Sequence, residues 1–168
     1  MKNRAPASTH KKVVVVFLDG SDEKGYLNPS ALGCGDEIDL LTPEGEHRRI
    51  ELRDAKAIYF VRELSEPFEP ERKTFLNRPK LDGLWVRLTF RDDDVMEGLI
   101  SSDLLDLLDT GVQITPPDLH GNSLRIFIPR SALREMKVLG VVGAARRAPR
   151  PGVPSRAPLP AQSKLFTE

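Results

Sequence analysis

The chain has 168 residues, of which 39% are hydrophobic and 30% charged, a composition typical of folded proteins rather than disordered ones. Its 25 basic and 25 acidic residues give a formal net charge of zero. The longest apolar run, Val13 to Leu18, is far shorter than the roughly 18 residues of a membrane span, and no secretory signal is visible, so we expect a cytoplasmic protein without membrane association.

The charge is divided unevenly along the chain. Residues 1–11 carry a net charge of +3 and residues 144–168 a net charge of +4, whereas residues 12–143 carry −7. Basic ends attract phosphates and acidic partners, and an acidic body repels a nucleic-acid backbone. Any nucleic-acid binding is therefore expected at the two ends.

The first predicted strands lie between residues 12 and 62. The segment Lys12 to Leu27 is a β-branched run that meets Asp19-Gly20, which is typical of a hairpin turn. Glu37 to Pro43 alternates apolar and polar residues and is predicted to be a third strand. Arg48 to Val61 then supplies two more strands, separated by a short turn at Asp54 to Lys56.

Residues 84–139 repeat this pattern. Five residues stand 73 positions after their counterparts in the first pattern: Val86, Leu88, Phe90, Asp92 and Gly98 after Val13, Val15, Phe17, Asp19 and Gly25. The offset then rises to 74 at Val112 and Ile114, to 76 at Arg125, Ile126 and Ile128, and to 77 at Val138. This order predicts an internal duplication with small insertions in the loops.

Five short strands in about 50–55 residues are typical of a small, strongly bent antiparallel barrel. The predicted fold is mostly β, with two tandem small antiparallel β-barrels of the SH3/Sm-like kind. Gly25 and Gly98 are expected where a strand bends sharply. The leucines of Ser102 to Asp109 have helical spacing and predict a short helix that caps an open barrel end. Barrels this small have little core, so we expect the two to pack on each other.

The predicted organisation has five segments. They are a flexible basic N-terminus (1–11), a first barrel (12–62), an extended linker (63–82) pinned by Phe68 and Phe75, a second barrel (83–143), and a disordered tail (144–168). The tail is rich in proline and arginine, and prolines prevent helices and strand ladders from running through it. Its segment Arg156 to Pro160 is similar to an SH3 ligand, and the apolar pair Leu165-Phe166 either docks on the body or stays free.

The sequence offers no catalytic or metal-binding pattern. The single cysteine, Cys34, excludes an intrachain disulfide and stands between glycines in a predicted loop. The three histidines, His10, His47 and His120, are scattered, and Asp92-Asp93-Asp94 is predicted to be a turn rather than a cation site. No nucleophile-and-base motif or phosphate-binding loop is present. We therefore predict no enzymatic activity, no catalytic residue, no metal and no cofactor.

Two stretches resemble motifs of the Sm-like proteins, which are small barrels that bind RNA. Phe17-Leu18-Asp19-Gly20 with Lys24-Gly25-Tyr26 resembles the first Sm motif. The segment Ile50 to Ile58 is similar to the second motif, with Arg53 in the place of its arginine and Asp54 where a glycine normally follows. The resemblance implies the barrel type. No asparagine stands where the family contacts RNA bases, so it does not by itself imply an RNA site.

A third stretch resembles half of the motif of PilZ proteins, which bind cyclic di-GMP. Asn28, Ser30 and Gly33 fit its (Asp/Asn)-x-(Ser/Ala)-x-x-Gly pattern, but the upstream pair of arginines is missing, so we do not expect cyclic di-GMP binding. Separately, the strings around Val13 to Tyr26 and Lys56 to Glu63 resemble an uncharacterised bacterial family found beside signalling domains. That resemblance implies a bacterial regulatory or adaptor context.

Together these observations favour a non-enzymatic binding or adaptor module with a protein partner. A partner segment could add to an exposed strand edge, and the candidate contact residues are the aromatic side chains Tyr26, Tyr59, Phe60 and Trp85. Tyr59 and Phe60 are adjacent and must face opposite sides of a strand, so one lies outside its own barrel core. The alternatives are Sm-like RNA binding, PilZ-like cyclic di-GMP binding, and RNA binding by the tail arginines Arg146, Arg147, Arg150 and Arg156.

Overall fold

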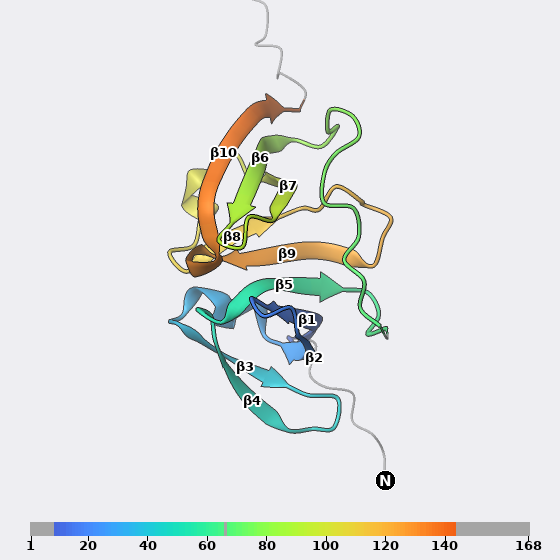
Figure 1. Ribbon diagram of the computed structural model, residues 1–168, viewed down its shortest axis with the longest axis vertical. Helices are drawn as coiled ribbons and strands as arrows, with labels where there is room; N and C mark the ends of the chain where they lie inside the picture. Colours follow the sequence, from blue (N-terminus) through green and yellow to red (C-terminus); the bar gives the residue numbers. More distant parts are fainter. Residues whose placement is uncertain (1–8, 66, 144–168) are drawn as a thin grey trace, which may run out of the picture.

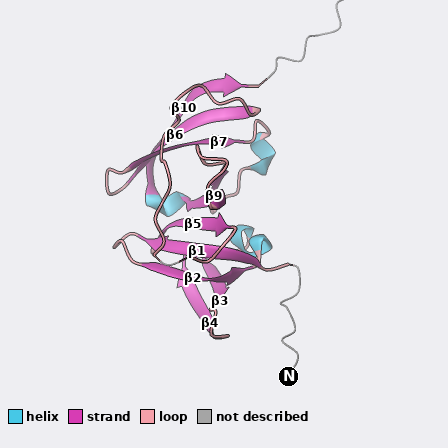
Figure 2. Ribbon diagram, turned by 90° about the vertical axis from the view of Figure 1, so that its right-hand side faces the viewer, coloured by secondary structure: helices cyan, strands magenta, loops and turns pink. Residues whose placement is uncertain are grey.

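The computed structural model describes residues 9–65 and 67–143, which form two antiparallel sheets (Figures 1 and 2). A seven-stranded sheet has the order β4-β3-β2-β1-β5-β9-β8, and a three-stranded sheet has the order β10-β6-β7. The strands are β1 (Lys11–Phe17), β2 (Asp22–Leu27), β3 (Glu37–Leu41), β4 (His47–Glu51), β5 (Ala55–Val61), β6 (Gly83–Phe90), β7 (Val95–Ile100), β8 (Gly111–Ile114), β9 (Ser123–Pro129) and β10 (Leu133–Val142). The predicted tail and most of the predicted N-terminal segment lie outside the described residues.

Three short 3₁₀ helices join the strands: η1 (Pro29–Gly33), η2 (Leu104–Asp106) and η3 (Arg130–Ala132). The helix expected over Ser102 to Asp109 is reduced to the three residues of η2. It buries none of its own side chains, and Leu105 is 92% exposed. The prediction that this segment caps a barrel is therefore wrong, because one turn is too short to form an apolar face.

The first half of the chain (β1 to β5) and the second half (β6 to β10) are joined by strand pairing rather than by packing alone. Strand β5 pairs with β1 on one edge and with β9 on the other, with Ile58 opposite Phe127 and Tyr59 opposite Ile126. Figure 1 shows β5 and β9 side by side at the middle of the molecule. Neither sheet closes into a barrel, which corrects the prediction of two closed barrels. The physical reason is that β9, and not β4, occupies the outer edge of β5.

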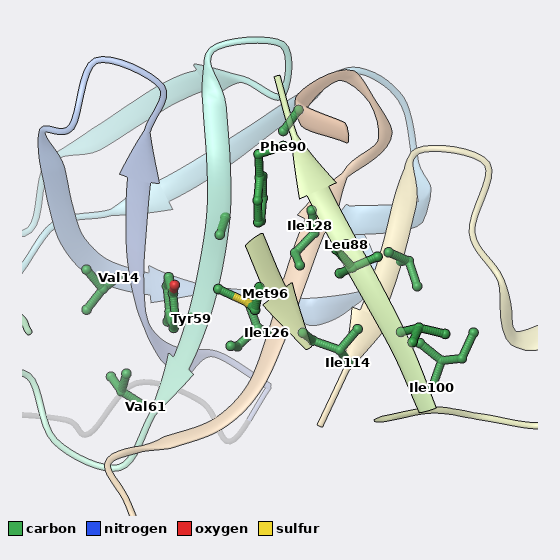
Figure 3. Close-up of a cluster of buried hydrophobic side chains, with 14 residues drawn as sticks. Val14, Tyr59, Val61, Leu88, Phe90, Met96, Ile100, Ile114, Ile126 and Ile128 are labelled. Carbon is green, nitrogen blue, oxygen red and sulfur yellow. The ribbon is translucent and has the colours of Figure 1, made fainter. Parts of the chain in front are cut away.

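Both faces of the seven-stranded sheet are covered by apolar side chains where the halves meet. Val13 and Val15 point into one buried cluster with Ile58 and Phe60, whereas Val14 points into the other. The second cluster combines Val14, Tyr59 and Val61 of the first half with side chains from β6 to β9, as Figure 3 shows. A strand buried on both faces is apolar at every position, which explains the unbroken run Val13–Val16.

The two halves repeat the same hydrogen bonds. The amide of Leu18 donates to the carbonyl of Asp54 at 3.1 Å, and the amide of Arg91 donates to the carbonyl of Ala132 at 3.0 Å. In each half the second strand is paired at a single position with the third strand or the residue after it, Tyr26 with Leu41 and Leu99 with Thr115. The order of strands β6 to β10 therefore follows that of β1 to β5.

The pairing register corrects the sequence alignment of the last two blocks. Ile50 lies opposite Ile38, and Ile128 lies opposite Val112. Likewise, Phe60 lies opposite Val13, and Val138 lies opposite Val86. Both correspondences have an offset of 78 instead of the predicted 76 and 77. Apolar residues recur often enough in strands to permit an alignment that is one or two positions out of register.

Gly25 and Gly98 occupy equivalent positions where one strand crosses closely over the next. A Cβ atom on Gly25 would lie 2.9 Å from Cγ of Leu40, and one on Gly98 would lie 2.7 Å from Cδ1 of Ile114. Any side chain would therefore force the crossing strands apart, which gives both glycines a packing role.

The linker between the halves is held against the body by the two predicted phenylalanines. The ring of Phe68 lies 5.0 Å from that of Tyr59, and the ring of Phe75 lies 6.0 Å from that of Trp85 in an edge-on arrangement. These contacts confirm that the linker is pinned by Phe68 and Phe75.

Candidate binding surfaces

The most buried charged side chain described is Glu97 on β7, which is 3% exposed. One oxygen of its carboxylate accepts hydrogen bonds from Nε and Nη2 of Arg87, at 3.2 and 2.8 Å. The other accepts from the Trp85 indole and from the backbone amide of Phe75, both at 3.2 Å. The Glu97 amide itself donates to the carbonyl of Lys73 at 2.6 Å. This residue therefore fixes the linker to strands β6 and β7.

The electrostatics of Glu97 suit a structural role. Burial alone would raise the pKa of its carboxyl group, but the hydrogen bonds from Arg87, Phe75 and Trp85 together outweigh burial and hold the pKa below its usual value. The carboxylate is thus charged and fully engaged.

A second charged cluster connects the turn after β6 with the first half and the linker. Asp94 accepts hydrogen bonds from Nζ of Lys56 at 2.9 Å and from Nζ of Lys73 at 2.6 Å. Lys56 also bonds to Asp92 at 2.5 Å and lies 5.0 Å from the centre of the Phe90 ring. The Asp92–Asp94 segment forms the predicted turn, and its carboxylates bind cationic side chains of the chain itself, because Asp93 pairs with the guanidinium of Arg134.

The four predicted contact aromatics divide into two pairs. Tyr59 and Phe60 are 5% and 8% exposed and face opposite clusters, so one of them lies outside the core of its own half, as predicted. It is Tyr59, which contacts the other half and the linker. Burial also raises the pKa of the Tyr59 hydroxyl. Tyr26 and Trp85 are half-buried, and the Trp85 indole is used by Glu97. None of the four forms an exposed aromatic surface.

The PilZ-like half-motif has a local role in the fold. The side-chain oxygen of Asn28 accepts a hydrogen bond from the amide of Ser30 at 3.1 Å, which caps the start of η1, and Gly33 ends the same helix. The tail arginines Arg146, Arg147, Arg150 and Arg156 lie outside the described residues, so the structure places none of them.

The described residues hold no group of three or more histidine, cysteine, aspartate or glutamate side chains suited to a metal ion. Cys34 is exposed and forms no disulfide. In the same part of the chain, no helix is long and apolar enough to cross a membrane.

A surface that the sequence analysis missed lies on β10. Met136 and Val138 lie opposite the buried residues Leu88 and Val86, at the positions that Ile58 and Phe60 occupy in the first half. Ile58 and Phe60 are buried, but Met136 is 43% exposed and Val138 56%. We define the β10 surface as the four exposed apolar residues of this strand: Met136, Val138, Leu139 and Val141.

The β10 surface has an open edge beside it. Strand β10 is ten residues long and, among the described strands, is hydrogen-bonded to β6 alone. A hollow of about 380 Å³ adjoins the start of β10. Its lining combines apolar side chains, among them Leu107, Val112 and Met136, with the charged side chains Arg130, Arg134 and Glu135. The signal in the sequence was the apolar content of LREMKVLGVV, which also fits a buried strand and so did not predict exposure.

No curated protein and no solved structure matches this chain. One family model matches residues 9–140, which are 132 of its 168 residues and include nine strands in full and most of β10. The model describes a family of unknown function, so it adds no activity to the geometry above. By this match the chain belongs to the family of unknown function DUF6982.

Proposed function

We propose that this chain is a non-enzymatic protein-binding module, built from two copies of one five-strand unit, which accepts an extended apolar segment of a partner protein along β10. One observation carries the proposal. The equivalent strand β5 is buried by its neighbour β9, whereas β10 exposes the same core-facing positions to solvent. A contiguous exposed apolar surface of this kind is typical of an interaction site.

The open part of the β10 edge supports strand addition. Arg78 of the linker donates to the carbonyl of Val141 at 2.9 Å, so the far end of β10 is already contacted. The stretch 135–139 remains as the accessible edge. An incoming strand would gain main-chain hydrogen bonds there, and the side chains of Met136 and Val138 would select apolar residues at alternate positions.

The charges on both outer edges oppose a second copy as the partner. Within one chain, β5 pairs with β9 and places Tyr59 opposite Ile126. If β10 of one copy paired in the same way with β4 of another copy, Lys137 would lie opposite Arg48. Like charges directly opposite each other destabilise a sheet. The partner that fits best is a different protein, whose segment carries apolar residues facing Met136 and Val138 and an acidic residue opposite Lys137.

The nucleic-acid and cyclic-dinucleotide alternatives gain no support from the described surface. One hollow of about 470 Å³ brings three arginines together, but as many acids line it: Arg53, Arg91 and Arg130 with Asp36, Glu51 and Asp109. These acids would repel a phosphate group. The basic ends therefore remain the only segments on which an RNA-binding hypothesis rests.

A peptide library tests the proposal. Random nine-residue peptides displayed on yeast would be selected against the full chain, and the selected peptides would be titrated against the variants Val138→Lys and Leu76→Lys. Leu76 is a matched control because it is 73% exposed and lies outside β10. We expect peptides with alternating apolar residues whose affinity falls at least tenfold in V138K and is unchanged in L76K.

Hydrogen exchange supplies the second readout. A bound peptide that adds as a strand should slow the exchange of backbone amides within 135–139. Selected peptides that bind V138K and the unchanged chain equally well, without protecting these amides, would refute the proposal.

A further inference from the structure

A groove of about 580 Å³ opens where the end of β7 diverges from β8, next to η2. The backbone pairing between β7 and the end of β8 is limited here to one isolated bridge, between Leu99 and Thr115, the residue after β8. The groove floor is apolar, and its rim carries more acids than bases. We call it the η2 groove, lined by Leu81, Asp82, Leu99, Ile100, Ser101, Asp103, Asp106, Leu107, Leu108, Gln113, Ile114, Thr115 and Arg125.

The η2 groove lies where the second half has no counterpart of a buried apolar side chain that η1 supplies in the first half. In the first half, η1 inserts Leu32 into the core, where it is completely buried. In the second half, η2 buries no residue, and Leu108 packs instead against the core cluster of the first half. The apolar position filled by Leu32 in one half therefore has no filling residue from η2 in the other.

The charge of the groove is opposite to that of the C-terminal segment. Asp82, Asp103 and Asp106 line the groove with a single base, Arg125, whose guanidinium bonds to Gln113 at 3.2 Å. The segment 144–168 carries five basic residues and one acidic residue. Long-range attraction between the two is therefore expected at low ionic strength.

The chain leaves β10 at the rim of this groove. Gly143 is the last residue before the C-terminal segment, and a Cβ atom added to it would collide with Asp82, one of the groove acids. The pair Leu165-Phe166 follows 22 positions later. A random coil of that length would have a root-mean-square span of roughly 26 Å, which is short enough to give the pair a high effective concentration at the groove.

We infer that segment 144–168 docks back into the η2 groove of its own chain. Leu165-Phe166 supplies the missing apolar plug, and the basic residues of the segment lie against Asp103 and Asp106. The groove shares no lining residue with the four residues of the β10 surface, although Leu107 and Leu108 line both the groove and the hollow beside that surface.

Paramagnetic relaxation in the full chain tests this inference, with a spin label on Cys34. That residue is the only cysteine and is exposed, and its neighbour Gly33 faces Leu108 of the groove, with 3.6 Å from an added Cβ to Cδ2. We expect the label to broaden the amide signals of residues 163–167 at low salt, and the broadening to decrease at least twofold in 0.5 M salt. In a mixture of labelled chains with isotope-enriched unlabelled chains, only broadening between different chains is detected, and we expect none.

Charge and plug variants separate docking from random sampling by a tethered chain. The double variant Asp103→Asn with Asp106→Asn preserves the cap of η2, because asparagine caps helices as well as aspartate does. In this double variant, most of the broadening of the amide signals of residues 163–167 should disappear. The matched control Glu44→Gln with Glu46→Gln removes the same charge from the distant β3–β4 turn and should keep it.

The plug is tested in the same way. Leu165→Ala with Phe166→Ala should abolish the broadening, whereas Val153→Ala with Leu159→Ala, two apolar losses elsewhere in the segment, should not. Equal broadening in the D103N/D106N variant and the unchanged chain would overturn the inference. So would broadening that arises only in the mixed sample, because that result would assign the groove to the tail of another copy.

Discussion

Replacing Glu97 by glutamine should loosen the linker and lower the stability of the whole chain. Glutamine keeps the shape of the side chain but loses the charge that Arg87, Trp85 and the Phe75 amide share. Breaking a fully buried ion pair costs about 3–5 kcal/mol. The Arg87 side chain is 49% exposed and stays solvated, so we expect a smaller loss, about 2 kcal/mol in the free energy of unfolding.

Urea unfolding followed by the fluorescence of Trp85, the only tryptophan, measures this loss at the site itself. With a slope of about 2 kcal/mol per molar urea, the midpoint should fall by about 1 M. Glu63→Gln is the matched control, since its pair with Lys12 is exposed and should change the stability by less than about 0.5 kcal/mol. Equal midpoints for E97Q and E63Q would refute the account of Glu97 as a structural clamp.

Three further predictions concern pH and packing. Because the pKa of Glu97 is lowered from its ordinary value of 4.5, its charge stabilises the fold above that pH. This stability is lost as the pH falls through the folded pKa, so the stability of E97Q should fall less steeply in acid. Gly98→Ala should lower the free energy of unfolding by about 1–3 kcal/mol, because the added methyl group would collide with Ile114. Gly140→Ala should leave the stability unchanged, because nothing lies within 4 Å of the added Cβ; a lower melting temperature for G98A alone would confirm the difference. Leu32→Ala should lower the free energy of unfolding, measured in urea, by about 2–5 kcal/mol, and Leu105→Ala should lower it by less than about 0.5 kcal/mol. Similar losses in the two variants would contradict the difference between η1 and η2.

Local sequence patterns predicted the strands because their periodicity is a short-range signal. The hairpin at Asp19-Gly20 and the strand from Glu37 occur as expected, whereas the turn before β5 lies at 52–54, two residues earlier than predicted. The pairing of β5 with β9 could not be predicted in this way. It joins residues about 67 positions apart, such as Tyr59 and Ile126, and unbroken apolar runs do not specify which edge a partner strand will take.

The binding surface was predicted less well than the fold. The sequence offers its aromatic residues as candidate contacts, but Tyr59 and Phe60 lie in the two buried clusters. Met136 and Val138 are exposed because, among the described strands, β5 has a neighbour on its outer edge and β10 has none. Such an absence leaves no mark in the residues of β10 themselves.

The shared sheet also fixes the order in which the protein can mature on the ribosome. Strand β5 ends at Val61, but β9, which covers its outer edge, begins at Ser123, 62 positions later. At roughly 5–20 residues per second, that interval is about 3–12 seconds. Throughout it, the nascent first half presents an uncovered apolar strand, so newly made chains should depend on chaperones most strongly before the second half emerges.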